Sequence, residues 1–180
     1  MKILVADDSR VSRNLLRSIL EELDFEVLVA ENGLEAWNIF QREEISLLIS
    51  DWEMPEMDGL ELCRRVRTAA AASRPGYTYI MMVTALDGMK NFVTGMAAGA
   101  DDFIVKPFEP EVLRCRVRVA QRVLAMQHEL RTFAAALPFC GACDMIQSDA
   151  GSTQRLHEFV GSRPELKQVL GTCPACAAKA

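Results

Sequence analysis

Apolar residues along the chain fall into five short runs, separated by amphipathic stretches with helical spacing. Four of the runs are almost continuously apolar, as expected of strands covered on both faces. The runs are Lys2–Ala6, Phe25–Ala30, Ser46–Ser50, Thr78–Val83 and Asp102–Val105. The helical patterns between them are Ser9–Leu23, Gly33–Glu43, Asp58–Thr68 and Asp87–Ala98. This alternation predicts an α/β fold, with a doubly wound, five-stranded parallel sheet and helices on both faces.

After the fifth run the pattern changes to one long helix, predicted over residues 110–137, which carries two apolar stripes. The first stripe would pack on the sheet and consists of Leu113, Val117, Ala120 and Leu124. The second continues past the first in steps of four and three, and consists of Val119, Val123, Met126, Leu130 and Phe133, then Leu137. A heptad stripe that outlasts its own domain favours a helical partner. We expect a parallel homodimer with the residues from Val119 to Phe133 at its seam; the alternative is that the C-terminal segment folds back over this stripe.

Composition and charge limit the class of protein. The chain has 180 residues, half of them apolar, which suits one domain with a small appendage. The net charge is −5, with 16 basic and 21 acidic residues in 1–137 and four of each in 138–180. Neither part has the basic excess that favours nucleic acid. No signal segment and no apolar run of the ~20 residues that span a bilayer is visible, so we expect a cytoplasmic protein without membrane insertion.

Polar side chains follow four of the five predicted strands. Asp7 and Asp8 follow the first, Asp51 the third, Thr84 the fourth and Lys106 the fifth. In an open parallel sheet these ends meet at one rim, where ligands bind. Three crowded carboxylates repel one another unless a cation joins them, and hard oxygen ligands suit Mg²⁺. Together the set matches a dianionic phosphoryl group, with a carboxylate as nucleophile and an ammonium and a hydroxyl to bind the oxygens.

Four stretches closely resemble the receiver domain of two-component response regulators. They are ILVADDS, LLISDWEMPEMDGLELCRRVR, IMMVTAL and GADDFIVKPFEPEVL. The resemblance covers residues 1 to about 125 and implies a flavodoxin-like receiver fold. The expected organisation is a receiver at 1–125, its last helix extended over 110–137 as a linker and dimerisation helix, and a small module at 138–180.

The resemblance also implies roles for single residues. Asp51 would be the phospho-acceptor. Mg²⁺ would be held by Asp8, Asp51, the backbone carbonyl of Glu53 and, through water, Asp7. Asp7 and Asp8 would thereby assist catalysis.

Further roles follow from the same resemblance. Thr84 and Lys106 would contact the phosphoryl oxygens, and Lys106–Pro107 would be a cis peptide. Phe103 falls at the aromatic switch position, where it would turn inward as Thr84 is drawn toward the phosphoryl group. Glu53 and Leu86 depart from any single consensus and would border the path of the hydrolytic water.

Four of the six cysteines form two pairs in the C-terminal segment. The pattern is Cys-x2-Cys-x29-Cys-x2-Cys, formed by Cys140, Cys143, Cys173 and Cys176. Two paired thiolates are the usual way to close a tetrahedral zinc site, and metal binding would offset the small apolar content of 138–180. Redox chemistry is the alternative. Cys63 and Cys115 are isolated, and we expect both to be small buried apolar residues.

The sequence therefore predicts a response regulator that accepts a phosphoryl group from a histidine kinase or a phosphotransfer protein. With no separate catalytic domain, it would catalyse only its own phosphotransfer and dephosphorylation, and would signal through contacts with a downstream protein that the sequence does not name. A second hypothesis is a redox or metal sensor that acts through the cysteine pairs. A third, nucleic-acid binding by a zinc-ribbon tail, is disfavoured by the neutral charge of 138–180.

Overall fold

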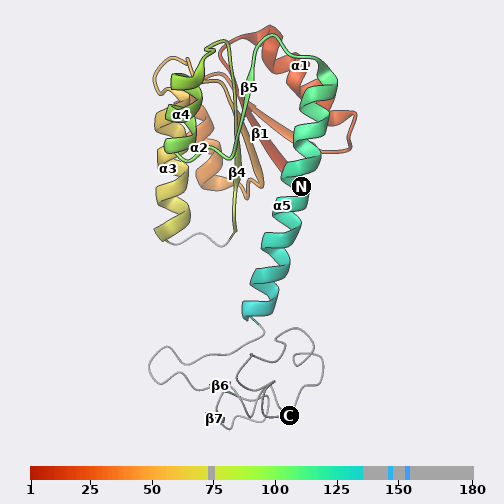
Figure 1. The fold of residues 1–180 in the computed structure, drawn as a ribbon, viewed down its shortest axis with the longest axis vertical. Helices are drawn as coiled ribbons and strands as arrows, with labels where there is room; N and C mark the ends of the chain where they lie inside the picture. The colour runs from red at the N-terminus through yellow and green to blue at the C-terminus, as the bar shows by residue number, and fades with distance from the viewer. Residues whose placement is uncertain (73–75, 136–145, 148–152, 155–180) are drawn as a thin grey trace, which may run out of the picture. The chain divides into compact units, whose positions relative to one another are not determined.

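A computed structural model of the chain describes residues 1–72, 76–135, 146–147 and 153–154. The chain divides into two compact units, Met1–His128 and Glu129–Ala180. The first unit contains a parallel sheet with the strand order β2-β1-β3-β4-β5 (Figure 1). Its strands are β1 Lys2–Ala6, β2 Glu26–Ala30, β3 Leu47–Ser50, β4 Tyr79–Thr84 and β5 Asp102–Val105. The predicted five-stranded, doubly wound α/β fold is confirmed.

Five helices connect or follow these strands. They are α1 Arg10–Glu21, α2 Gly33–Arg42, α3 Gly59–Ala72, α4 Met89–Ala97 and α5 Pro110–Ala135. Helices α1 and α5 cover one face of the sheet, and α2, α3 and α4 cover the other (Figure 1). Ser9 and Asn32 cap α1 and α2, because each side-chain oxygen accepts a backbone N–H of the first turn.

Each face of the sheet has its own apolar core. Ile3, Val5 and Ile49 point to the side of α1 and α5, whereas Leu4 and Leu48 point to the side of α2 and α3. Successive residues of a strand alternate between faces, which explains why the central positions of these strands are apolar on both sides. The first stripe of α5 packs as expected: Leu113, Val117 and Ala120 are fully buried, and Leu124 is partly buried.

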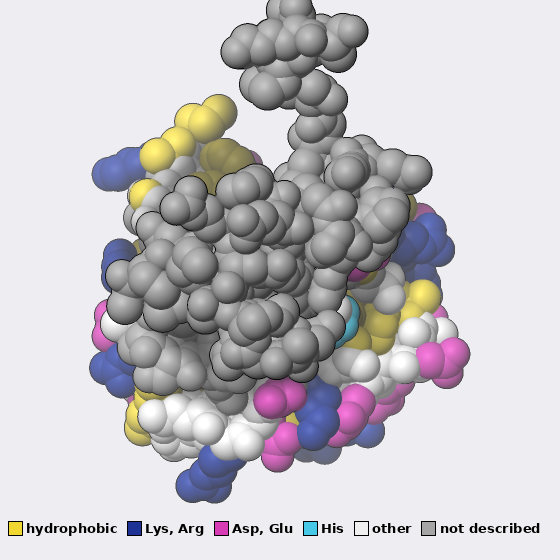
Figure 2. Space-filling view, turned by 90° about the horizontal axis from the view of Figure 1, so that it is seen from below, with side chains coloured by type: hydrophobic (Ala, Val, Ile, Leu, Met, Phe, Trp, Pro, Cys, Tyr) yellow, Lys and Arg dark blue, Asp and Glu magenta, His cyan; other side chains and the backbone are white. Residues whose placement is uncertain are grey.

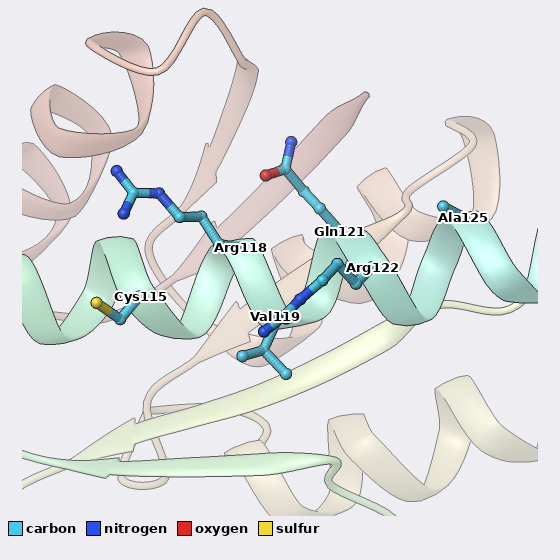
Figure 3. A pocket seen from close by; sticks show the side chains of 6 residues that line it. All are labelled: Cys115, Arg118, Val119, Gln121, Arg122 and Ala125. Carbon is cyan, nitrogen blue, oxygen red and sulfur yellow. The ribbon is translucent and has the colours of Figure 1, made fainter.

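The second stripe of α5 is largely exposed. Val119, Met126 and Leu130 are 38%, 63% and 62% exposed, whereas Val123 is half-buried against the core of its own domain. The side chain of Phe133 lies outside the described residues, as do residues 136 and 137. Cys115 lies on the same side of α5 as Val119 and is exposed, so the prediction that it is buried is wrong (Figure 3). Cys63 is fully buried, as expected.

Beyond the end of α5, the second unit is described at only two short strands. Strands β6 Ile146–Gln147 and β7 Thr153–Gln154 pair antiparallel. All four cysteines of the predicted zinc site lie outside the described residues. No helix in the described part of the chain combines the length and the apolar character needed to cross a membrane.

Candidate functional site

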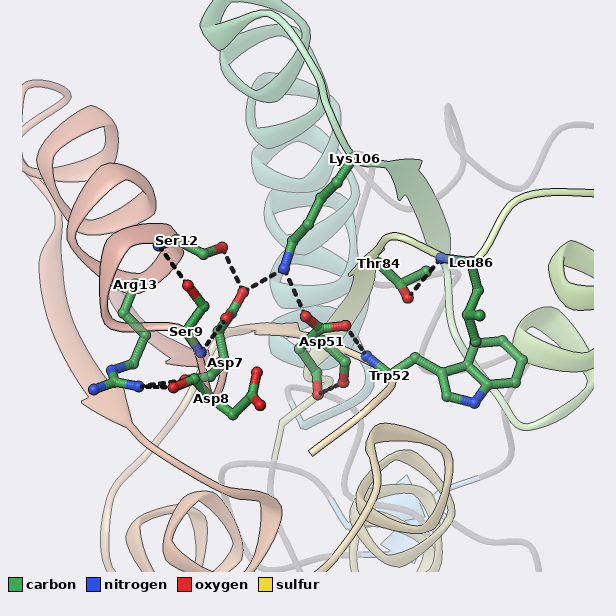
Figure 4. A network of polar contacts seen from close by, with 11 residues as sticks. Asp7, Asp8, Ser9, Ser12, Arg13, Asp51, Trp52, Thr84, Leu86 and Lys106 are labelled. Atoms are coloured by element: carbon green, nitrogen blue, oxygen red, sulfur yellow. Dashed lines mark hydrogen bonds and ion pairs between the residues drawn. The ribbon is translucent and has the colours of Figure 1, made fainter. Parts of the chain in front are cut away.

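The carboxyl ends of four strands bring polar residues together at one rim of the sheet (Figure 4). Asp7 follows β1, Asp51 follows β3 and Lys106 follows β5, whereas Thr84 is the last residue of β4 and not the first after it. Backbone hydrogen bonds continue the pairing beyond the strands, from Asp51 N to Ala6 O (2.7 Å) and from Lys106 N to Thr84 O (2.8 Å). The sheet therefore sets the position of each of these residues.

Asp7 is fully buried and its carboxylate is bound on both oxygens. Oδ1 accepts a hydrogen bond from the backbone N–H of Ser9 at 2.9 Å. Oδ2 accepts one from the hydroxyl of Ser12 at 2.5 Å and one from Nζ of Lys106 at 2.6 Å. A buried carboxylate with a counter-charge and further donors is held in one orientation.

Asp51 is joined to Asp7 by the same ammonium group. Lys106 Nζ lies 2.6 Å from Oδ2 of Asp51, and the backbone N–H of Trp52 donates to Oδ1 at 2.6 Å. The Asp51 side chain is 11% exposed, so it remains open to a ligand from the rim. Burial lowers the pKa of Lys106, but its hydrogen bonds to Asp51 and Asp7 and their charges outweigh this, so the pKa is raised overall.

The loop after β3, which begins with Asp51, packs against the start of α3. A Cβ atom at Gly59 would lie 2.0 Å from the backbone oxygen of Asp51, so only glycine allows this approach. The backbone N–H of Gly59 also donates to Trp52 O at 2.8 Å. The close contact fixes the loop that carries Asp51.

Three carboxylates can converge on a cation at this rim. Oxygen atoms of Asp7, Asp8 and Asp51 lie within 4.8 Å of one another. Asp8 is exposed and lines a surface hollow together with Trp52, Glu53 and other residues of the loop after β3. An all-oxygen donor set that is open to solvent fits Mg²⁺, which keeps several of its waters.

Next to the carboxylates, Phe103 lies in an aromatic cluster. Its ring is 9% exposed and makes edge-to-face contacts with Trp52 and Phe92, at centroid distances of 6.4 and 5.9 Å. The hydroxyl of Thr84 accepts a hydrogen bond from the backbone N–H of Leu86 at 3.2 Å. Phe103 therefore faces inward while Thr84 is bound to its own loop. The Lys106–Pro107 peptide is cis, as expected.

The sequence interpretation missed several residues of this site. Ser12 and Arg13 in α1 contact the Asp7–Asp8 turn, and Trp52 and Phe92 flank Phe103. One signal was available, because Arg13 occupies the apolar face of α1 three residues before Leu16. A charged residue on a buried helix face requires a polar partner.

Comparison with known proteins decides the family. Residues 3–118 match the family model of the response regulator receiver domain. The chain belongs to this family. It is 43% identical over 116 residues to a chemotaxis protein CheY homolog of Campylobacter jejuni, a match that covers 63% of this chain and 87% of that protein. It is 41% identical over 121 residues to chemotaxis protein CheY1 of Helicobacter pylori, covering 66% and 95%.

Solved structures show the same receiver fold. The chemotaxis response regulator CheY4 of Vibrio cholerae aligns with a TM-score of 0.60 and 32% identity, covering 66% of this chain and 97% of that one. The receiver domain of the Francisella response regulator 1452 aligns with a TM-score of 0.61 and 30% identity, covering 67% and 96%. The chain therefore contains a CheY-like receiver of a two-component system, and nothing in these comparisons favours a redox or metal sensor.

Membership in the family carries two general properties. Receivers interact with a histidine kinase or a phosphotransfer protein, and they generally bind Mg²⁺ at an acidic pocket, which here corresponds to the three-aspartate rim. The family match ends at residue 118, so it does not extend to residues 138–180.

Proposed function

We propose that Asp51 accepts a phosphoryl group from a phosphohistidine donor. The observation that carries the proposal is the Asp51 carboxylate at the rim, beside the Lys106 ammonium and the carboxylates of Asp7 and Asp8. A carboxylate oxygen of Asp51 attacks phosphorus and forms the O–P bond. The P–N bond of the donor breaks, and its electron pair goes to the imidazole nitrogen.

The neighbouring residues of the receiver bind the transferred group. Lys106 exchanges its bond to Asp51 for one to a phosphoryl oxygen, and the hydroxyl of Thr84 donates to another. Asp8, Asp51 and the carbonyl of Glu53 would hold Mg²⁺, with Asp7 acting through water, and the ion would supply positive charge that offsets the charge on the phosphoryl oxygens. Beyond this phosphotransfer and the later hydrolysis we assign the chain no enzymatic activity.

A small phosphodonor tests the acceptor assignment. Intact-mass measurement should show that the wild-type protein gains one base-labile phosphoryl group in the presence of Mg²⁺. Asp51→Asn should gain none. Asp58→Asn is the matched control, because Asp58 is an exposed aspartate of the same loop, and it should be phosphorylated like wild type. Uptake by Asp51→Asn at the wild-type rate would show that the assignment is wrong.

We infer that the signal leaves this cytoplasmic protein through contacts with another protein. The net charge is −5, and basic and acidic side chains are interspersed around the visible part of the face in Figure 2. This supports the expectation that nucleic acid is not a partner. We further propose a parallel homodimer through α5, because Val119, Met126 and Leu130 expose apolar surface along one helix.

For residues 138–180 we propose a structural zinc site formed by Cys140, Cys143, Cys173 and Cys176. The support is the spacing of the two pairs, because four thiolates close a tetrahedral site. Elemental analysis of the purified protein should find one zinc per chain. A zinc-selective chelator should release it and, with Mg²⁺ present in excess, leave phosphorylation of Asp51 nearly unchanged. Absence of zinc, or a disulfide within each pair, would contradict the site.

A further inference from the structure

The two aspartates of the turn between β1 and α1 are held in different ways. The Asp7 carboxylate accepts hydrogen bonds from Ser9, Ser12 and Lys106. In the part of the chain that the structure describes, no group donates to the carboxylate of Asp8, which is exposed. The position of Asp8 is therefore set by its main chain.

Arg13 binds that main chain directly. Its Nη1 atom donates to the backbone oxygens of Asp7 at 2.7 Å and of Asp8 at 3.0 Å (Figure 4). Its Nη2 atom lies 2.6 Å from Oε1 of Glu31, the residue that follows β2. The Arg13 side chain is 8% exposed, so its long chain is fixed by packing as well as by hydrogen bonds.

We propose that Arg13 is a positioning residue for the Mg²⁺ and phosphoryl site. A planar guanidinium that binds two successive carbonyl groups fixes the turn between them. This keeps the free carboxylate of Asp8 beside Asp51, at the place where both can reach one cation. The inference rests on the proposed function, because it assigns Arg13 a part in the binding of the metal used there. Groups that orient metal ligands in this way commonly affect metal affinity.

Charge and position predict opposite effects for the loss of Arg13. The guanidinium is a positive charge close to a site for a cation, so neutralising it would by charge alone strengthen Mg²⁺ binding. If Arg13 acts by holding the turn, its removal should weaken Mg²⁺ binding. The sign of the change therefore separates the two roles, and a purely structural role would change stability without changing Mg²⁺ affinity.

A Mg²⁺ titration of the full-length protein tests the proposal. The fluorescence of Trp52 reports on the site, because its backbone N–H binds Asp51. Arg13→Gln should raise the Mg²⁺ dissociation constant by about tenfold, the lower end of what loss of such a supporting residue costs. Arg13→Lys keeps the charge but lacks the forked guanidinium, so its Mg²⁺ dissociation constant should lie between those of wild type and Arg13→Gln. Arg17→Gln is the matched control, because it removes the same charge from an exposed position on α1, and it should bind Mg²⁺ like wild type.

Circular dichroism and the melting temperature without Mg²⁺ establish that each variant is folded. If Arg13→Gln does not fold, Arg13→Lys replaces it, because lysine keeps the positive charge and removes the forked guanidinium; it should weaken Mg²⁺ binding by a few-fold. Suppose that wild type and Arg17→Gln bind Mg²⁺ and are phosphorylated. If the folded Arg13 variant then binds Mg²⁺ as tightly as wild type, or more tightly, the positioning role of Arg13 is overturned and the proposed function is not. Failure of wild type itself to bind Mg²⁺ would overturn the proposed function and this inference with it.

Discussion

Lys106 contacts both buried carboxylates of the rim. Its ammonium group lies 2.6 Å from Asp7 and 2.6 Å from Asp51, and its side chain is 21% exposed. Without a metal ion it supplies the positive charge that offsets the two aspartates. The ammonium therefore has a structural part in the resting protein, besides the binding of phosphoryl oxygens that we propose.

Lys106→Met should destabilise the metal-free protein. Asp7 would remain buried with one donor fewer and no counter-charge, and the expected loss is roughly 2–4 kcal/mol in the free energy of unfolding. Saturating Mg²⁺ should recover much of this loss, because it restores a positive charge between the carboxylates. Urea unfolding with and without Mg²⁺ measures both effects.

Arg17→Met is the control for this change, because the Arg17–Glu21 pair is exposed and contributes little. A Lys106→Met protein as stable as wild type without Mg²⁺ would show that the ammonium is not needed to offset Asp7.

At the scale of elements, a second polar network ties α3 to the starts of β4 and β5. Arg67 donates to the carbonyls of Thr78 (2.6 Å) and Gly99 (2.8 Å) and pairs with Asp101 at 2.6 Å. Its guanidinium also lies 4.9 Å from the ring centroid of Tyr77, whose hydroxyl donates to Asp101. The network therefore joins α3 to the segments that precede β4 and β5.

The two tyrosines at this end of the sheet predict that the protein unfolds at alkaline pH. Burial, followed by the hydrogen bond to Asp101, raises the pKa of Tyr77 to about 12. Burial, followed by the charge of Asp102, raises the pKa of Tyr79 to about 12. A raised pKa means that the folded state favours the neutral phenol. The stabilisation is fully present below about pH 10, the ordinary pKa of tyrosine, and should be lost as the pH rises toward 12.

Tyrosinate absorbance measures this directly, because the chain contains two tyrosines. In the native protein both should ionise well above pH 10, together with the loss of far-ultraviolet circular dichroism. In urea both should ionise near pH 10. Tyr77→Phe should remove one of the two transitions. Ionisation of both tyrosines near pH 10 in a protein that stays folded would contradict the prediction.

Most elements were predictable from the apolar pattern, and the exceptions have physical reasons. Each strand was placed to within one residue, because apolar runs end sharply at Asp7, Asp51 and Lys106. Helix α3 was predicted to end at Thr68 but continues to Ala72. The last residues are alanines, which favour a helix but do not distinguish a buried face from an exposed one, so the apolar pattern does not show where the helix ends. The contacts of Arg13 join separate segments, and spacing along one helix does not reveal such partners.

At the scale of the whole molecule, α5 carries the proposed dimer. Arg116, at the edge of the stripe, is paired with Asp102 at 3.0 Å, which accounts for a charge at this position. Because Val123 already packs on its own domain, the exposed seam consists of Val119, Met126 and Leu130. Sequence spacing alone treats all of these positions alike, since it does not show which residues the domain itself covers.

Met126→Glu combined with Leu130→Glu should abolish the dimer, because two charges per chain would be buried at the seam. Sedimentation velocity should show wild type as a dimer and the double variant as a monomer, with phosphorylation of Asp51 retained. Val11→Glu is the control, because Val11 is 79% exposed and lies on α1, outside the proposed seam. A wild-type monomer at high concentration would rule out the dimer and favour a C-terminal segment that folds back over α5.

The bridge from Lys106 to Asp7 has a consequence for how the protein is made. The two residues are 99 positions apart in the chain, and β1 is separated from β5 by β3 and β4. During synthesis the aspartates emerge first, and the lysine that completes their site emerges with the last strand of the sheet. A partly made chain therefore lacks the ammonium group that joins Asp7 to Asp51 and that we propose to bind phosphoryl oxygens. We therefore expect the proposed phosphorylation site to form only when all five strands of the sheet have been made.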